Sequence, residues 1–592
     1  MLARVLRAGE GGPPSPEAFL ADLRAELQAQ AQATHQRAQL SLAAAVTLHA
    51  VRAYWSQLAP ASLPLYEPPR GCEAIPERTA VAAQRIGDAI AKLPVAEAGY
   101  QLGLLYTGLL PAKWRSSYGV HYTPPSLADR LLDQAEAAGL NWLHAKVLDP
   151  AAGAGAFLVP AAQRLLRALD DCEPALVVQN LSARIRGYEL DPFAAWLGHV
   201  LIEVAALPAM IAAGRRLSAL VAVRDSLTGD IPGAAFDLVI ANPPFGRVSL
   251  PDAQRQRYLR SLYGHANLYG LFMDLATQLA QPGGLISFLT PSSFLAGEYF
   301  KSLRALLWRQ APPLSLDFVT VRKGVFEGVL QETVLATYRK EGRRQRVSVS
   351  FIHPQPGSPA APAPAGGFTL PRIPTAPWVV PRHSNEAEFA AGLRRMPKRL
   401  ADWGYRVSTG PLVWNRHKPQ LRDALGKRTV PLIWAECVTG DGRFVFRSQK
   451  RNHKPYFRIR DADEWLLVCR PCVLLQRTTA KEQARRLIAA ELPAAFLQKH
   501  GGRVTIENHL NMLIPTGPRP AVSPAILAAF LNTEAADRAF RCLSGSVAVS
   551  AYELENLPLP AAADLSALLG RRRDAFAVER ACHQLYLADV EP

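Results

Sequence analysis

The sequence predicts an α/β protein in which a parallel sheet with helices on both faces forms the central domain. Between residues 146 and 340, short apolar runs such as "KVLDP", "RIRGYEL" and "FDLVIANPP" alternate with helical stretches, an alternation typical of parallel sheets. Residues 15–110 are rich in Ala, Leu, Gln and Arg, which favours helices. A mixed, basic region follows residue 367. We therefore expect three folded parts, with the sheet in the middle.

One segment between these parts predicts a linker. The stretch "PQPGSPAAPAPAGG" (354–367) is too rich in Pro, Ala and Gly to build a core. The chain is accordingly expected to contain a helical N-terminal region over 1–115, the α/β domain over 116–345, a Pro/Ala-rich linker over 346–385 and a mixed α+β domain over 386–592.

Composition and charge indicate a folded protein with a polyanionic partner. Of the 592 residues, 49% are hydrophobic and 20% charged, as in ordinary folded domains. There is no uncharged apolar run of about 18 residues, and residues 1–25 lack the apolar core of a signal peptide, so we expect a cytoplasmic protein without a membrane span. The net charge is +17, and residues 381–530 hold 26 Lys and Arg against 12 Asp and Glu. Such a local surplus favours a polyanion as the partner of this region.

The cysteines do not predict a metal site. There are seven, and they are scattered along the chain. The one close pair, Cys469 and Cys472, has no second pair and no His cluster nearby, whereas a zinc ribbon needs four ligands. We expect no bound metal.

Three acidic residues at the ends of predicted strands favour a site for a nucleoside with a positively charged tail. Asp149 ends the strand before the turn that contains Gly153, Glu189 ends "RIRGYEL", and Asp225 ends "VAVRD". Asp149 is placed to face a cation, Glu189 to accept from both ribose hydroxyls and Asp225 to accept from an adenine amine. S-adenosylmethionine fits this description. Each acid alone also fits a helix N-cap, and only the ordered series favours the cofactor.

The order of the motifs resembles a known family. Residues 116–340 contain, in this order, "GVHYTPPSLADRLL", "VLDPAAGAGAF", "GYELDP", "RDS", "IANPPFG", "NLYGLFMDLATQLAQPGGLISFLTPSSFL" and "GVFEGVLQETVLATY". The series resembles the DNA adenine-N6 methyltransferases of type II restriction–modification systems, in particular the gamma class typified by the TaqI methyltransferase. The resemblance implies a Rossmann-like class I methyltransferase sheet, S-adenosylmethionine as cofactor, double-stranded DNA as substrate and a target recognition domain over 386–592. It also implies a monomeric enzyme, and it allows for a cognate restriction endonuclease encoded separately.

Within this resemblance, the loop "NPPF" is expected to carry the chemistry. The exocyclic amine of adenine is a poor nucleophile because its lone pair is delocalised into the ring. The side-chain amide oxygen of Asn242 and the carbonyl oxygen of Pro243 would each accept one amine hydrogen, while Pro244 keeps both acceptors aimed. Phe245 would stack on the base, which must leave the duplex to react, and the family implies a second stacking ring at Phe326. The alternative is that Asn242 caps a helix and Phe245 fills the core.

The resemblance also assigns the contacts to the cofactor. Tyr122 and Thr123 correspond to the methionine end of the family's pocket, although Tyr122–Pro125 also fits an ordinary helix entry. The other expected contacts are Asp149, Gly153, Glu189 and Asp225.

A basic stretch in the C-terminal region predicts contacts to DNA. Residues 447–460, "RSQKRNHKPYFRIR", hold six Lys or Arg with Tyr456 and Phe457 between them. Such residues fit contacts to phosphates together with some readout of base edges, although a solvated charged face is the alternative. The residues expected to contact DNA are Arg447, Lys450, Arg451, Lys454, Arg458, Arg477 and Lys481.

Three other functions use similar chemistry. A protein-glutamine methyltransferase of the release-factor type has an Asn-Pro-Pro-aromatic loop but lacks a large basic C-terminal domain. A cytosine-N4 methyltransferase usually has Ser where this chain has Asn242. A modification subunit would bind DNA through a separate specificity protein, whereas the C-terminal stretches "VSTGPLVWNRHK" and "LSGSVAVSAYELENLPLP" resemble recognition domains of stand-alone enzymes.

Overall fold

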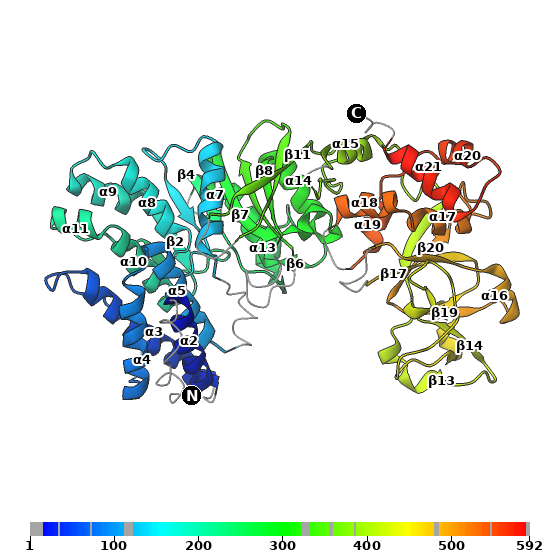
Figure 1. Ribbon diagram of the computed structural model, residues 1–592, viewed down its shortest axis with the longest axis horizontal. Coiled ribbons are helices and arrows are strands. Elements are labelled where there is room, and N and C mark those ends of the chain that lie inside the picture. The colour runs from blue at the N-terminus through cyan, green and yellow to red at the C-terminus, as the bar shows by residue number, and fades with distance from the viewer. Residues whose placement is uncertain are drawn as a thin grey trace, which may run out of the picture. The chain divides into compact units, whose positions relative to one another are not determined.

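The chain forms two compact units (Figure 1). The computed structural model describes residues 16–32, 36–70, 74–111, 122–230, 233–320, 332–354, 359–383, 386–478, 485–544 and 548–587. The first unit comprises residues 1–291, 306–343 and 352–362, and the second comprises 292–305, 344–351 and 363–592. Each unit therefore combines segments that are separated in the sequence.

Four helices form the N-terminal part of the first unit, as the composition of this region predicts. They are α2 (Pro16–Gln32), α3 (Gln36–Leu58), α4 (Glu77–Ile90) and α5 (Val95–Leu109). Buried residues of α4 recur every three or four positions from Thr79 to Ile90, which gives the helix one apolar face. Gly87 lets α4 approach α3 closely, because a Cβ there would lie 2.2 Å from the carbonyl oxygen of Ala50.

Seven strands of the first unit lie side by side in the order β8-β9-β7-β4-β1-β2-β3. Their bounds are β1 (Val147–Asp149), β2 (Ile185–Glu189), β3 (Val221–Val223), β4 (Phe236–Ala241), β7 (Ala280–Pro291), β8 (Pro313–Val319) and β9 (Thr333–Arg339). The strands from β3 to β7 pair in parallel, which confirms the predicted parallel sheet. Strand β9 departs from it and runs antiparallel to both β7 and β8. It follows β8 in the chain and returns beside it, so no crossover is needed.

Helices cover this sheet, as predicted. The helices described between residues 122 and 310 are α7 (Pro125–Ala137), α8 (Leu158–Ala168), α9 (Pro174–Arg184), α10 (Pro192–Ala205), α11 (Leu207–Ala213), α12 (Asp252–Arg257), α13 (Leu268–Leu279) and α14 (Lys301–Gln310). Helices α7, α8 and α10 form one connected layer, and α13 covers β4 and β7. A short antiparallel pair, β5 (Arg247–Val248) and β6 (Ala266–Asn267), follows β4.

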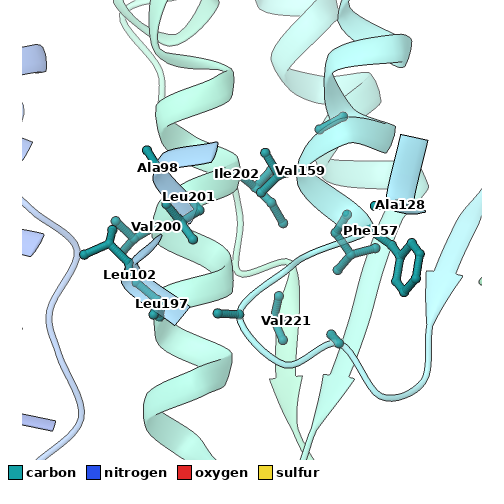
Figure 2. Close-up of a cluster of buried hydrophobic side chains, with 14 of the residues drawn as sticks. Ala98, Leu102, Ala128, Phe157, Val159, Leu197, Val200, Leu201, Ile202 and Val221 are labelled. Carbon is teal, nitrogen blue, oxygen red and sulfur yellow. The ribbon is translucent and has the colours of Figure 1, made fainter. Parts of the chain in front are cut away.

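Helix α10 is mostly apolar because it is packed on several sides. It contacts β2, β3, α8 and α5, and Figure 2 shows its Leu197 and Leu201 near Ala98 and Leu102 of α5. Within the described residues, no single helix has both the length and the apolarity to cross a bilayer. Together, α10 and α11 meet the length and composition criteria, but they are bent by 70°.

The second unit is mixed α+β, as predicted for the C-terminal region, and its described residues after 386 form two sheets. One has the order β12-β20-β17-β18 and the other the order β13-β15-β14-β19-β16. The strands are β12 (Tyr405–Thr409), β13 (Leu421–Arg422), β14 (Thr429–Ile433), β15 (Tyr456–Arg458), β16 (Leu467–Val468), β17 (Cys472–Gln476), β18 (Ala489–Leu492), β19 (Val504–Ile506) and β20 (Leu510–Pro515). The helices are α15 (Ala387–Arg395), α16 (Ala494–Lys499), α17 (Pro524–Leu531), α18 (Glu534–Leu543), α19 (Ala551–Glu555), α20 (Ala562–Leu569) and α21 (Ala575–Leu587). The unit has one apolar core around Trp403 and Phe530, which includes residues of the first sheet, and another around Trp434, which includes residues of both sheets.

The segment predicted as a linker, 346–385, is partly folded. It contains β10 (Val347–Ile352) and β11 (Pro362–Phe368). The side chains of Phe368 and Trp378 are fully buried, and the backbone N–H of Trp378 donates to the Leu295 carbonyl oxygen at 2.8 Å. Composition alone predicts a linker here because the many Pro and Ala residues outweigh the few large apolar residues that are buried.

Residues 292–305 belong to the second unit, although the sequence places them inside the predicted domain 116–345. The reason is Arg304, whose side chain is fully buried. Its guanidinium donates to the carbonyl oxygens of Phe294, Gly297 and Thr375 at 2.7–3.2 Å. A buried guanidinium needs such acceptors, and here they come from both sides of the predicted boundary at residue 345.

Candidate active site at the carboxyl edge of the sheet

The four polar residues that the sequence places at strand ends lie along one edge of the sheet. Asp149 is the last residue of β1 and Glu189 the last of β2, while Asp225 and Asn242 follow β3 and β4. Because these four strands are parallel neighbours in the order β4-β1-β2-β3, their carboxyl ends share an edge. The chain moves from β1 to β2 and β3 on one side and then crosses to β4 on the other. Ligands of open α/β sheets bind at such a switch point, here between Asp149 and Asn242.

The turn after β1 uses its two glycines differently. Both have left-handed backbones, with φ of 51° at Gly153 and 79° at Gly155. A Cβ on Gly153 would meet no atom within 4 Å, whereas one on Gly155 would lie 3.3 Å from the Cα of Gly198 in α10. Gly155 therefore serves close packing of the turn on α10, while the backbone at Gly153 stays open to a ligand.

The carboxylate of Glu189 is held by two backbone groups. Its Oε2 accepts from the Gly153 N–H at 2.8 Å and its Oε1 accepts from the Asp191 N–H at 2.9 Å. Burial raises the pKa of Glu189, while these two hydrogen bonds lower it. Each oxygen retains a further lone pair, so the carboxylate can accept from two hydroxyl groups of a ligand.

Asp149 is a buried carboxylate with a missing partner. Its side chain is 1% exposed, and its Oδ1 accepts from the Ala151 N–H at 2.9 Å. Its Oδ2 is buried without a hydrogen-bond partner among the residues that the structure describes. Burial raises the pKa of Asp149 well above its ordinary value, and the Glu189 carboxylate raises it further. A bound cation would remove this cost, so the site suits a positively charged ligand.

Asp225 is exposed and less constrained. Its Oδ1 accepts from the Leu227 N–H at 2.9 Å, an arrangement that fits the expected contact to an adenine amine without requiring it. Within the described part of the chain, no three His, Cys, Asp or Glu side chains are grouped so that they could hold a metal ion.

Asn242 contacts the segment that precedes α7. Its Nδ2 donates to the hydroxyl of the buried Thr123 at 3.1 Å. The two residues are 119 positions apart, yet the sequence assigned both to one site. Because the Nδ2 of Asn242 donates to Thr123, the Oδ1 of the same carboxamide group lies on the other side. The helix-entry alternative for Tyr122–Pro125 also holds, because Pro124 is the N-cap of α7 and Pro125 begins the helix.

The loop "NPPF" is not a helix cap. Residues 242–246 are all described, and they lead from β4 to β5 without a helix, so the helix-cap alternative for Asn242 is wrong. Pro243 is buried, and Asn242, Pro244 and Phe245 are partly exposed. The Phe245 ring meets the Tyr269 ring edge to face, with centroids 6.2 Å apart, and it packs against the core. The core-filling alternative for Phe245 is therefore partly right.

Helix α5 lines a cavity beside two of the predicted site residues, and the sequence did not single this helix out. A cavity beside Tyr122 and Thr123 is lined by Val95, Gly99 and Tyr100 as well as by the turn that begins α8. These α5 residues lie outside the motif series, so the family resemblance could not find them.

The predicted DNA-binding residues fall into two groups. Lys450, Arg451 and Arg458 are exposed. By contrast, the Arg447 Nε donates to the Glu436 carbonyl oxygen at 2.6 Å, and Lys454 forms an ion pair with Asp423.

Arg477 and Phe457, which belong to the same prediction, are more buried. Arg477 is half-buried, with a 3.4 Å hydrogen bond from Nη1 to the Asn508 carbonyl oxygen. Phe457 is fully buried in the core around Trp434, so it is not available to a nucleic acid. Phe326 and Lys481 lie outside the described residues.

Comparisons with known proteins agree with this arrangement. Residues 227–322 match the Eco57I restriction-modification methylase family. The chain is 26% identical over 483 residues to the type II methyltransferase M.BsuBI of Bacillus subtilis, which covers 76% of this chain and 88% of that protein. It is also 26% identical over 333 residues to the type II methyltransferase M.PstI of Providencia stuartii. That alignment covers 55% of this chain and 65% of M.PstI. The fold resembles the type IIL restriction-modification enzyme MmeI, solved in complex with DNA, with a TM-score of 0.54 and 12% identity over 97% of this chain and 96% of that one.

The similarity to methyltransferases implies S-adenosylmethionine as the cofactor, and the residues at the sheet edge fit it. The orphaned carboxylate oxygen of Asp149 suits a cation, and the spare lone pairs of Glu189 suit a ribose. Residues 227–322 thus match the Eco57I restriction-modification methylase family, the chain is similar to type II methyltransferases, and its fold is similar to that of a restriction–modification enzyme.

Proposed function

We propose that this protein methylates the N6 amine of an adenine flipped out of double-stranded DNA, as the modification enzyme of a restriction–modification system. The observation that carries the proposal is the pairing of Asn242 with Thr123 at 3.1 Å, directly after β4 and beside β1, which ends in the buried Asp149. An amide acceptor and an unpaired carboxylate at neighbouring strand ends suit a nucleophilic amine and a cationic donor.

The cofactor half of the site would hold S-adenosylmethionine through four residues. Glu189 would accept from the ribose hydroxyls, Asp225 from the adenine amine, and Asp149 would face the positive charge next to the open backbone of Gly153. When bound, the cofactor supplies a methyl group on a sulfonium. A direct transfer of this kind needs no covalent enzyme intermediate.

The catalytic half would act on the target amine. The Oδ1 of Asn242 and the carbonyl oxygen of Pro243 would each accept one amine hydrogen, which draws the nitrogen towards tetrahedral geometry and frees its lone pair. Two features keep these acceptors aimed: the hydroxyl of Thr123 engages Nδ2, and Pro244 restricts the backbone. Acceptors that need no reorganisation during the reaction lower the barrier most effectively.

The target base must leave the duplex to reach these acceptors. Phe245 offers a partly exposed ring, braced from the side by Tyr269. Stacking on an aromatic ring contributes about 1–3 kcal/mol per base, comparable to the few kcal/mol that flipping costs. Phe326 remains a predicted second stacking ring.

Recognition of DNA is assigned to the second unit. The support for this is its surplus of Lys and Arg and the exposed side chains of Lys450, Arg451 and Arg458. We further propose a cytoplasmic, monomeric enzyme with a separately encoded restriction endonuclease as its counterpart.

The test is to express the full chain alone in cells without other DNA methylation and to sequence their DNA with a method that detects modified bases. We expect N6-methyladenine at one short recurring sequence. N4-methylcytosine would contradict the adenine assignment. Unmodified DNA, with recovery of modification only when a specificity protein is added, would contradict independent recognition.

A further inference from the structure

Helix α5 meets the residues of the cofactor site at several points. It provides Val95, Gly99 and Tyr100 to the cavity beside Thr123. Further along the helix, Gly103 faces the ring of Tyr122, and a Cβ on this glycine would lie 2.0 Å from the Tyr122 Cε1. No other residue type at position 103 would leave the ring where it is.

One turn further on, Tyr106 reaches the loop after β2. Its side chain is 4% exposed, and its hydroxyl donates to the Oδ2 of Asp191 at 2.6 Å across 85 positions of sequence. Burial, followed by the Asp191 carboxylate, raises the pKa of the Tyr106 hydroxyl, so the hydroxyl keeps its proton and acts as a donor.

Asp191 links this contact to Glu189. The Oδ1 of Asp191 accepts from the Phe193 N–H at 2.8 Å and so caps α10. The Asp191 N–H in turn donates to the Oε1 of Glu189, whose Oε2 accepts from Gly153. A continuous series of hydrogen bonds therefore runs from Tyr106 through Asp191 and Glu189 to the turn after β1.

The hydroxyl of Tyr106 gives a hydrogen-bond donor to a loop that carries two nearby carboxylates. Glu189 and Asp191 are carboxylates two residues apart, and after burial they are the main causes that raise the pKa of the Tyr122 hydroxyl. Without a donor, the Oδ2 of Asp191 would be a desolvated acceptor with a like charge nearby. It would then compete for the backbone N–H groups that now orient Glu189.

We propose that α5 forms a wall of the cofactor site and that Tyr106 is a positioning residue for Glu189. The N-terminal helical region is then a required part of the methyltransferase site. The inference rests on the proposed role of Glu189 in binding S-adenosylmethionine. Packing alone is the competing explanation, since the Tyr106 ring lies 4.8 Å from the ring of Phe193.

The full-length variant Tyr106→Phe separates the two explanations, because it keeps the ring and removes the hydroxyl. We expect its dissociation constant for S-adenosylmethionine, measured by calorimetry, to rise by roughly tenfold, as for the loss of one hydrogen bond to a charged group. With unmodified genomic DNA and saturating cofactor, kcat should stay close to that of the original protein while KM for the cofactor rises.

Tyr405→Phe is the matched control. Tyr405 is equally buried, and its hydroxyl donates to the Val522 carbonyl oxygen at 2.6 Å in the second unit. The Tyr405→Phe variant should bind S-adenosylmethionine with the affinity of the original protein. Equal losses of affinity in the two variants, or an unchanged affinity in Tyr106→Phe, would overturn the inference.

A second variant, Gly103→Ala, tests the other contact of α5. It should displace the Tyr122 ring and also weaken cofactor binding, measured on protein that circular dichroism shows to be folded. If the unsubstituted protein did not bind S-adenosylmethionine at all, the proposed function would fail. If it bound but the Tyr106 and Gly103 variants bound equally well, only the role of α5 would fail.

Discussion

The sheet edge of the first unit and the basic stretch of the second unit were both predicted from sequence, and they differ in how the predicted residues are placed. At the sheet edge, Asp149, Glu189 and Asn242 come together and are fixed by short hydrogen bonds. In residues 447–460, the cations divide between exposed positions and local partners such as Asp423. A strand end fixes where a side chain lies, whereas a run of like charges fixes only composition. The following experiments test that difference.

The largest effect is expected from Asn242→Ala. Removing one of two aimed acceptors should lower kcat by about 10²–10³-fold, the usual loss for such a preorganised group. Cofactor binding should stay near normal, because Asn242 is assigned to the target amine. Single-turnover methylation of DNA and calorimetry with S-adenosylmethionine measure the two quantities. Turnover near that of the original protein would exclude the catalytic assignment.

Glu189→Ala should weaken cofactor binding by roughly a hundredfold, because a ligand's hydroxyls lose a charged acceptor worth about 1.5–3 kcal/mol. DNA binding in a gel shift should change little. The control is Glu173→Ala, an exposed acid before α9 that makes no capping hydrogen bond. If both variants retained full affinity, the ribose site would lie elsewhere.

Cofactor affinity should fall at low pH because of Asp149. Its pKa is raised in the unliganded protein, and a cation favours the ionised form, so affinity should drop about tenfold per pH unit below that pKa. The free energy of unfolding of the unliganded protein has the opposite dependence. A raised folded-state pKa contributes stability at low pH that is lost as pH rises through it. Calorimetry across a pH series checks the first slope, which Asp149→Asn should flatten.

Thr123→Val should lower kcat by roughly fivefold to tenfold, the effect of losing one neutral hydrogen bond that orients a catalytic group. Valine keeps the volume of threonine but cannot accept from the Nδ2 of Asn242. Thr123→Ser retains the hydroxyl and should restore much of the rate. An effect on cofactor affinity alone would assign Thr123 to the cofactor and not to the orientation of Asn242.

The smallest effects are expected in the basic stretch, one cation at a time. Arg451→Ala should reduce the slope of log affinity for DNA against log salt by about one, if Arg451 neutralises one phosphate. Lys454→Ala is the matched comparison, because Lys454 already pairs with Asp423 and should contribute less to that slope. Equal changes would show that local ion pairs do not predict which cations face DNA.

The parallel strands, their order along the chain and the acids that end them could all be predicted from sequence. These features depend on local patterns, namely short apolar runs followed by Gly, Pro or Asp, whereas Thr123 was assigned to the site through the family resemblance. The direction of β9 could not be predicted, nor could the inclusion of residues 292–305 in the second unit. Both depend on partners distant in the sequence, such as the buried contacts of Arg304.

The sequence by itself determined which polar residues stand at the sheet edge, because strand ends and a rigid Asn-Pro-Pro loop leave few places for an amide or a carboxylate to point. Only the tertiary structure decided what surrounds that chemistry. The contact of Tyr106 with Asp191 spans 85 positions, and Gly103 is a glycine because the Tyr122 ring lies against it. Contacts of this kind leave no period and no turn signal in the chain, since they depend on how helices and strands pack and not on what each prefers locally.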